Sequence, residues 1–284
     1  MKLTFAHLTK QYGNFTALED FSYTFTPGVY GLLGPNGAGK STLMNILTGN
    51  LQATAGHILL DGTPVQELGA AFRKRIGFMP QQQGLYPEFT LEHFLWYMAS
   101  LKGLSKKQAK EEIPHLIQLV NLNGQEHKRL GGFSGGMKQR ALIAQAMLGK
   151  PDILILDEPT AGLDPKERIR IRNLIAEAAF DRIVLIATHV VTDVAYIAKE
   201  ILLLKQGMIL DSGTPPILCK KLEGKVFLVN CAEEDLSALA EQGKICNITG
   251  EENGISVRIL CDAPPPNAVT CKPDLEDVYL RNFE

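Results

Sequence analysis

The sequence predicts an α/β protein with a mostly parallel sheet, an antiparallel β part, a helical insertion and a small C-terminal α+β appendage. Three observations predict this fold. A glycine-rich loop joins an apolar strand to a helix within residues 30–42. Two continuous apolar runs, 153–156 and 183–187, are typical of parallel strands that are buried on both faces. The pattern then changes near residue 215, where a second set of short elements begins.

The composition indicates a globular chain, because 45% of its 284 residues are hydrophobic and 21% are charged. The net charge of −2 argues against a nucleic-acid partner that is held by overall charge. The N-terminal residues lack a signal-peptide core, and no apolar run approaches the roughly 18 residues that span a bilayer. We therefore expect a soluble chain, for which any membrane role requires a partner.

The first elements are predicted to be strands, at residues 2–8, 21–25 and 29–33. Residues 11–14 have the composition of a turn, and Tyr12 lies within it. Its aromatic ring could be a platform for a nucleotide base or a turn side chain that caps a sheet. Spacing alone favours the second interpretation.

The loop after the third strand matches the phosphate-binding pattern G-x-x-x-x-G-K-S, and an amphipathic helix begins at Lys40. Glycines allow backbone N–H groups to turn inward, and the helix adds its own free N–H groups and the positive end of its dipole. Lys40 would reach the β- and γ-phosphates, and the Ser41 hydroxyl would bind Mg²⁺. The alternative is a glycine-rich turn with an incidental lysine, but the complete pattern between a strand and a helix favours the phosphate site. The residues expected to contact the nucleotide here are Gly34, Pro35, Asn36, Gly37, Ala38, Gly39, Lys40, Ser41 and Thr42.

The middle of the chain changes from strands to helices. A short strand at 75–79 leads into a polar, proline-bounded loop at 81–87. Apolar residues then recur at helical spacing, so residues 90–128 are predicted to be a helical insertion. A second glycine-rich loop, 130–136, precedes a helix at 137–148.

Two acids follow the apolar strand at 153–156, namely Asp157 and Glu158. Because a buried carboxylate without a partner is costly, this pair is unlikely to be part of the core. The carboxyl end of a parallel strand is a common position for a ligand site. We therefore expect both acids to belong to a ligand site.

Polar residues also follow the next helix and strand. Asp164 is a plausible cap for a helix that begins at Pro165. His189 stands at the end of the strand 183–187. A lone histidine is more often structural than catalytic, but its position beside a phosphate site favours a functional role.

The appendage is predicted to contain strands at 225–230, 245–249 and 255–261. Asn253-Gly254 has the composition of a hairpin turn, and Asp274 would cap a last helix. No cysteine pair has metal-ligand spacing, so free thiols in a reducing compartment are expected. The cysteines are Cys219, Cys231, Cys246, Cys261 and Cys271.

Together these motifs resemble the nucleotide-binding subunit of an ATP-binding-cassette (ABC) transporter, over about residues 1–215. The strongest mark is F-S-G-G-M-K-Q-R at 133–140, which looks like the signature motif of that family. Phe133 stands where leucine is usual, and Met137 stands where glutamine is frequent. The working residues of the motif are intact, and they are Ser134, Gly135 and Gly136.

The resemblance implies a P-loop ATPase core that binds ATP and Mg²⁺ and couples ATP hydrolysis to transport. It implies a nucleotide-binding domain at 1–215, with a helical subdomain at about 86–135, and leaves 216–284 as the α+β appendage.

The resemblance also implies a role for each motif residue of the phosphate site. Tyr12 would stack on adenine, which reverses the interpretation from spacing. Gln81 would lie on the loop that senses the γ-phosphate and the metal and faces the membrane partner. Asp157 would hold Mg²⁺ through water, Glu158 would act as the general base, and His189 would contact the γ-phosphate.

The signature loop would act across a dimer interface. In this family each ATP lies between the phosphate loop of one protomer and the signature loop of the other, so Ser134, Gly135 and Gly136 would contact the ATP of the partner. Asp164 would lie on a loop that crosses to the other protomer. A homodimer is expected, although a pairing with a related cassette remains an alternative.

The resemblance implies an integral-membrane permease as the second partner, and a location on the cytoplasmic face of the cell membrane. The segment Pro273–Leu280 looks like the ending common in bacterial ABC-2-type exporters of drugs, antibiotics and lantibiotics, which favours export. The alternatives are an ABC importer ATPase and a soluble ABC ATPase without a membrane partner. A small-molecule P-loop kinase is a further alternative, but the signature loop argues against it.

Overall fold

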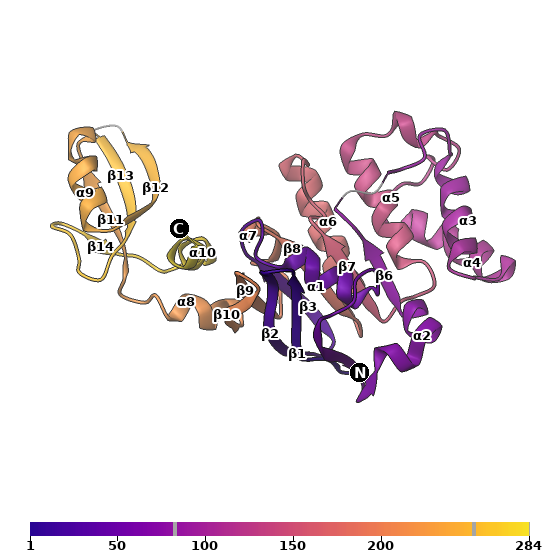
Figure 1. Cartoon of the computed structure of the whole chain (residues 1–284). Coiled ribbons are helices and arrows are strands. Elements are labelled where there is room, and N and C mark those ends of the chain that lie inside the picture. The colour runs from indigo at the N-terminus through magenta and orange to yellow at the C-terminus, as the bar shows by residue number, and fades with distance from the viewer. Residues whose placement is uncertain (82–83, 252–253, 284) are drawn as a thin grey trace. The chain divides into compact units, whose positions relative to one another are not determined.

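The computed structural model describes residues 1–81, 84–251 and 254–283 (Figure 1). The chain forms two compact units, Met1–Leu210 and Asp211–Glu284. Each unit contains a hydrophobic cluster of its own. None of the helices in these residues has the length and hydrophobicity of a membrane span.

The first unit begins with an antiparallel sheet in the strand order β2-β1-β4-β5. Apolar side chains of β1 and β2 enter the core, where the ring of Phe5 meets Phe21 and Phe25 edge-on at 5.5 Å between centroids. The strands are β1 (Leu3–Tyr12), β2 (Phe15–Phe25), β4 (Ala55–Leu60) and β5 (Thr63–Pro64).

The second sheet of this unit has the order β10-β9-β3-β8-β7-β6, and its central pairs from β9 to β6 are parallel. Its strands are β3 (Gly28–Leu33), β6 (Ile76–Met79), β7 (Ile153–Asp157), β8 (Ile183–Thr188), β9 (Glu200–Lys205) and β10 (Met208–Gly213). All residues of β7 and β8 are buried, as their continuous apolar runs predict. The carboxyl ends of β3, β7 and β8 therefore open at one edge of the sheet.

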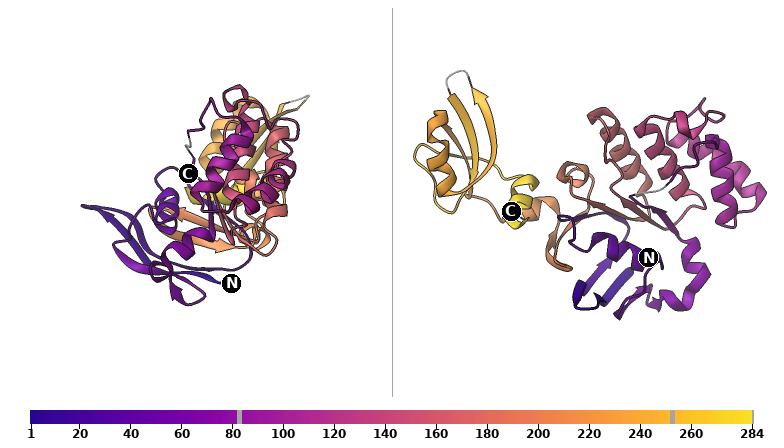
Figure 2. Two further views of the ribbon diagram at one scale, coloured as in Figure 1. Left: turned by 90° about the vertical axis from the view of Figure 1, so that its right-hand side faces the viewer. Right: turned by 45° about the horizontal axis from the view of Figure 1, so that its top comes forward.

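The helices of the first unit are α1 (Lys40–Leu47), α2 (Val65–Lys74), α3 (Leu91–Leu101), α4 (Lys106–Leu119), η1 (Leu130–Gly132), α5 (Gly135–Met147), α6 (Pro165–Ala178) and α7 (Val191–Val194). The predicted helical insertion is confirmed: α3 and α4 lie within it and pack against each other and against α5 (Figure 2). Each begins at a side-chain cap, since Thr90 accepts from the N–H of His93 and Ser105 forms a capping box with Gln108.

The sequence patterns do not predict two helices of this unit, α2 and the four-residue α7. Helix α2 buries only Val65 and Phe72, and its backbone is interrupted at Gly69, where φ is +51°. Because the apolar face of α2 is short and interrupted, the sequence shows no clear helical period there. A smaller difference concerns Tyr12, which is the last residue of β1 rather than part of the turn.

The second unit is a small α+β fold, as predicted. Its antiparallel sheet has the order β12-β13-β11-β14, and its elements are α8 (Pro215–Lys220), β11 (Val226–Cys231), η2 (Glu233–Asp235), α9 (Leu236–Gln242), β12 (Lys244–Glu251), β13 (Gly254–Leu260), β14 (Val269–Thr270) and α10 (Leu275–Phe283). Asn253 of the predicted hairpin turn lies outside the described residues. The five cysteines are free thiols.

The last helix is tied to the sheet by a buried ion pair. The Asp277 side chain is 1% exposed and accepts from Nε of Arg258 on β13 at 2.9 Å. The Asp274 carboxylate accepts from the N–H of Glu276 at 2.8 Å and of Asp277 at 3.0 Å, so the predicted cap is confirmed.

Candidate functional site

The loop between β3 and α1 has the backbone that a phosphate cradle requires. Gly39 precedes α1 in a left-handed conformation, with φ of +102°, and a Cβ there would lie 2.7 Å from the carbonyl oxygen of Ala17. A Cβ at Gly34 would lie 2.3 Å from the carbonyl oxygen of Leu204. Only glycine fits these two positions. No side chain caps the N-terminus of α1, so its free N–H groups and its dipole are available to an anion.

Lys40 is folded back onto its own loop. It is 7% exposed, and its Nζ donates to the carbonyl oxygens of Pro35, at 3.0 Å, and of Gly34. Burial lowers the pKa of Lys40, while Glu158 and Asp157 oppose that shift. A phosphate in the cradle would give this ammonium group a compensating anion.

Asp157 and Ser41 face each other at the end of β7 and the start of α1. The Ser41 hydroxyl donates to Oδ2 of Asp157 at 3.3 Å. Asp157 is 7% exposed, and burial raises the pKa of its carboxyl group. The two side chains therefore present hard oxygen ligands side by side, at a point where the low dielectric strengthens any cation's attraction.

Glu158 is held by the end of the neighbouring strand β8. Its Oε2 accepts from the hydroxyl of Thr188 at 3.1 Å, and its Oε1 accepts from the N–H of His189 at 3.1 Å. Nδ1 of His189 lies 2.7 Å from the same oxygen. Glu158 is 5% exposed and has a left-handed backbone, with φ of +50°. Such a conformation costs energy in a residue with a Cβ and is often found at functional sites.

A cavity of about 190 Å³ brings most of the predicted residues together. It is lined by Tyr12, Phe15, Ala17, Asn36, Gly37, Ala38, Gly39, Lys40, Ser41, Thr42, Gln81, Asp157 and Glu158. Phe15 was not predicted to lie here. It pairs with Tyr12 across the β1–β2 turn, and the two rings are 62% and 49% exposed. An aromatic residue three positions after Tyr12, across a Gly13-Asn14 turn, was the signal in the sequence.

The remaining predicted residues do not line this cavity in the described part of the chain. Gly34 and Pro35 contribute the carbonyl groups that hold Lys40, and His189 reaches the site through Glu158. Ser134 caps α5 by accepting from the N–H of Met137 at 3.3 Å. Asp164 caps α6 by accepting from the N–H of Glu167 at 2.9 Å, as predicted.

The two glycines of the signature loop have different surroundings. A Cβ at Gly135 would meet only Leu163 Cδ2, at 3.8 Å, which is ordinary contact. A Cβ at Gly136 would lie 2.8 Å from Oε2 of Glu167, an acid that also lies 3.4 Å from Nε of Arg140. A Cβ at Gly136 would therefore force the Glu167 side chain to shift away from Arg140, whereas a Cβ at Gly135 would displace none of the described residues.

The residues of the cavity fit a magnesium ion that is completed by phosphate and water. Ser41 and Asp157 supply adjacent oxygens, and Gln81 lines the same cavity. No cluster of three His, Cys, Asp or Glu side chains in the described ranges could hold a metal alone. Mg²⁺ commonly binds through one or two protein oxygens together with substrate phosphates, so the single carboxylate is sufficient.

Several known proteins are similar in sequence to this chain. The profile of the ABC transporter family matches residues 18–161. The chain is 36% identical to the ABC transporter ATP-binding protein YxlF of Bacillus subtilis, over 82% of this chain and 77% of that protein. It is 31% identical to the Nod factor export ATP-binding protein I of Burkholderia thailandensis, over 98% of this chain and 96% of that protein.

Solved structures share the fold. A dimeric structure of a bacterial ABC transporter cassette, MJ0796, superposes with a TM-score of 0.67 at 25% identity, over 75% of this chain and 98% of that cassette. The residues matched by the family profile, 18–161, include the phosphate loop with Lys40, the helical insertion and the Asp157-Glu158 pair of this chain. This chain therefore belongs to the ABC transporter family, as an ATP-binding subunit that hydrolyses ATP.

Proposed function

We propose that this chain drives the export of a substrate through an integral-membrane permease. The observation that carries the proposal is the similarity to an export ATP-binding protein over 98% of this chain, which includes the appendage as well as the cassette. An importer ATPase would share the cassette, but nothing in the appendage favours one.

We assign 1–215 to the nucleotide-binding domain, 86–135 to its helical subdomain and 216–284 to the appendage. Within the domain, residues 34–42 hold the phosphates of ATP through backbone N–H groups and Lys40. Tyr12 stacks on the adenine ring. Phe15 lies beside it on the same cavity and offers a second aromatic face.

Glu158 acts as the general base for the attacking water. Its position supports this role, since Thr188 and His189 fix both carboxylate oxygens at the edge of the phosphate cavity. A positioned base of this kind contributes a factor of about 10²–10⁴ in rate. His189 and Gln81 complete the site by contacting the γ-phosphate, and most of the remaining acceleration comes from positioning and electrostatics.

Mg²⁺ is the cofactor proposed for the cavity, held by Ser41, Gln81 and Asp157. When bound, the ion supplies positive charge to the phosphate oxygens. In this structure the Ser41 hydroxyl donates a hydrogen bond to the Asp157 carboxylate at 3.3 Å. With the ion bound, the hydroxyl oxygen would turn towards the metal instead.

The active form is a dimer, for which a second copy of this chain is the simplest partner. Ser134, Gly135, Gly136 and Asp164 lie outside the cavity of their own chain, so they are available to the ATP of the other protomer. The open space at Gly135 supports this arrangement, because a phosphate could approach the backbone N–H groups at the start of α5. Loss of the γ-phosphate would remove that contact and loosen the dimer.

The permease would dock on the Gln81 loop and the helical subdomain, which places the chain on the cytoplasmic face of the membrane. A cluster of aromatic rings supports this surface. Tyr86 and Tyr97 are 45% and 37% exposed, and both pack against Phe89, with ring centroids 4.9 Å and 5.8 Å away. Exposed aromatic side chains are enriched in protein interfaces. We propose no nucleic-acid partner, in keeping with the net charge of −2.

The test is a pull-down of the tagged full-length chain from its native membrane in mild detergent, with mass spectrometry of the co-purifying proteins. Recovery of a protein with several hydrophobic spans of roughly 20 residues each is expected. The double variant Phe89→Ala, Tyr97→Ala should lose that protein, whereas Phe180→Ala, at a still more exposed ring elsewhere, should retain it. Recovery of ribosomes or DNA alone would contradict the export proposal and favour a soluble ABC ATPase.

A further inference from the structure

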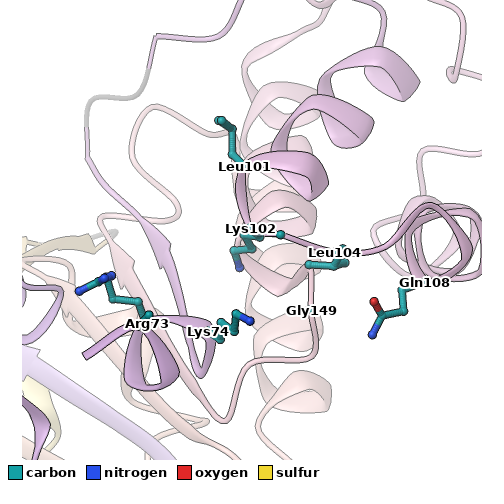
Figure 3. A pocket seen from close by; sticks show the side chains of 9 residues that line it. Arg73, Lys74, Leu101, Lys102, Leu104, Gln108 and Gly149 are labelled. Carbon is teal, nitrogen blue, oxygen red and sulfur yellow. The ribbon is translucent and has the colours of Figure 1, made fainter. Parts of the chain in front are cut away.

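The first unit contains a cavity that is separate from the nucleotide site. A cavity of about 550 Å³ lies between the end of α2, the α3–α4 connection, the start of α4 and the residue Gly149 after α5 (Figure 3). It shares no lining residue with the nucleotide cavity. Its volume lies within the range of roughly 300–1,000 Å³ that is usual for small-molecule sites.

The polar side chains that line this cavity are all hydrogen-bond donors or cations. They are Arg73, Lys74, Lys102 and Gln108, and no carboxylate is among the described lining residues. The local charge is therefore +3, although the whole chain carries −2. Figure 3 shows the side-chain nitrogens of Lys74 and Lys102 directed into one space, while Arg73 extends to the other side.

Three donors in the cavity remain available to a ligand. Nζ of Lys102 donates to the carbonyl oxygens of Ala146, at 3.2 Å, and Leu148, at 2.8 Å, which leaves one of its three protons. Lys74 has no hydrogen-bond or ion-pair partner within the part of the chain that the structure describes.

Gln108 supplies the third donor. Its Oε1 accepts from the N–H of Ser105 at 2.9 Å and from the Ser105 hydroxyl at 2.8 Å. The amide oxygen of Gln108 is therefore used by the cap of α4. The NH₂ group of the same amide remains a donor for an acceptor on a ligand.

The electrostatics also favour an anion. Burial lowers the pKa of Lys102 to about 8, and the neighbouring Glu112 only partly opposes that shift. Glu112 does not line the cavity, because its Oε1 accepts from the N–H groups of Gly149, at 2.9 Å, and Lys150, at 3.2 Å. A desolvated ammonium group gains most from an opposite charge that is brought beside it.

We propose that this cavity binds a phosphate-bearing ligand. Donors from three elements, α2, the α3–α4 connection and α4, line this one cavity. A ligand that contacts all of them needs several acceptor oxygens, which suits a phosphate better than a carboxylate. Lysine is a frequent phosphate ligand as a point charge. Ala70 and Leu104 add an apolar wall for the carbon part of the ligand, which is a soluble phosphate ester or a phospholipid headgroup.

The first experiment uses inorganic pyrophosphate as the probe and isothermal titration calorimetry on the full-length chain, with the nucleotide site saturated by ADP and Mg²⁺. We expect one saturable site. Lys74→Gln should weaken binding about tenfold, the usual loss for one charged hydrogen bond. Gln108→Glu should weaken it at least as much, since it places a carboxylate in the cavity while glutamate still completes the capping box of α4. Lys107→Gln, on α4 but outside the cavity, is the matched control and should bind normally.

The second experiment separates the two sources of phosphate. Sedimentation with vesicles of phosphatidylcholine, alone and mixed with phosphatidylglycerol, should show variant-sensitive binding if the ligand is a headgroup, and none if it is a soluble ester. Either pattern, together with the pyrophosphate site, supports the proposal. A chain without saturable pyrophosphate binding, or one in which Lys107→Gln weakens binding as much as Lys74→Gln, overturns it.

Discussion

At the scale of single residues, Glu158 combines a left-handed backbone with a fully engaged carboxylate. Its replacement by glutamine should lower the rate of ATP hydrolysis by a factor of about 10²–10⁴, because the amide cannot accept the proton of the attacking water. ATP affinity should persist. Glutamine keeps an oxygen for the N–H of His189 and the same volume beside Thr188, so the site retains its shape.

The measurement is steady-state phosphate release, combined with size-exclusion chromatography in ATP, where Glu158→Gln should accumulate as a nucleotide-bound dimer. Glu177→Gln is the control, since Glu177 is an exposed acid on α6 that lies away from the cavity. Hydrolysis by Glu158→Gln at the wild-type rate would show that another group takes the proton.

Lys102 gives a prediction about pH. The folded pKa of about 8 lies below the ordinary value of 10.5, so between these values the unfolded chain binds more protons than the folded one. The free energy of unfolding should therefore rise with pH in this window, by at most about 1.4 kcal/mol per pH unit from this residue. Below pH 8 both states carry the charge, and the full cost of burying it is present.

Urea unfolding of the wild type and of Lys102→Met across this window isolates the effect, because the other titrating groups are common to both chains. The wild-type free energy should rise more steeply than that of the variant. Parallel curves would mean that the ammonium group of Lys102 is not desolvated, and would weaken the electrostatic argument for the anion cavity.

At the scale of elements, two adjacent glycines at the start of α5 are expected to have different roles, Gly135 in function and Gly136 in packing. Gly135→Asp should abolish hydrolysis while sparing monomeric ATP binding and thermal stability. The added side chain has space next to Leu163, and an acid is favourable in the first turn of a helix, but it would repel the γ-phosphate of the partner's ATP.

Gly136→Ala is the contrasting variant. It should lower the melting temperature, because its Cβ would press on Oε2 of Glu167 and disturb the Arg140–Glu167 pair. Differential scanning fluorimetry and phosphate release on both variants make the comparison. Loss of stability in Gly135→Asp, or normal turnover, would contradict the cross-protomer role of this loop.

Elements with a strong period or a specific motif were predictable from the sequence. The apolar runs of β7 and β8, the phosphate loop and the caps at Asp164 and Asp274 each have a local physical cause, so the residues alone indicate them. Helix α2 has no such cause, since its contacts come from the sheet beneath it and its backbone breaks at Gly69. Phe15 is an intermediate case, because its spacing from Tyr12 is visible in the sequence but its place in the cavity depends on the pairing of β1 with β2.

The anion cavity illustrates why a site of dispersed residues escapes sequence analysis. Lys74, Lys102 and Gln108 share no motif, and they meet only because α2, α3 and α4 pack where they do. The nucleotide cavity, by contrast, takes nine of its lining residues from two short segments, 36–42 and 157–158.

At the scale of the whole molecule, the decisive question is whether one chain contains a complete catalytic site. In a symmetric dimer with shared sites, a mixed dimer of Lys40→Ala and Gly135→Asp would carry both lesions in one site and none in the other. A dimer of either variant alone has no intact site. Lys40→Ala damages both phosphate loops, and Gly135→Asp damages both signature loops. Mixing two inactive chains should therefore restore hydrolysis.

If the sites act independently, an equimolar mixture should recover roughly a quarter of the wild-type rate, because half of the dimers are mixed and half of their sites are intact. The readouts are phosphate release and the ATP-dependent pull-down of one tagged variant by the other. Each variant mixed with itself at the same total concentration is the control. If mixed dimers form without any recovery of activity, hydrolysis requires two intact sites in the same dimer. If neither mixed dimers nor activity is found, the catalytic site is confined to one chain, and Gly135 must act by another route.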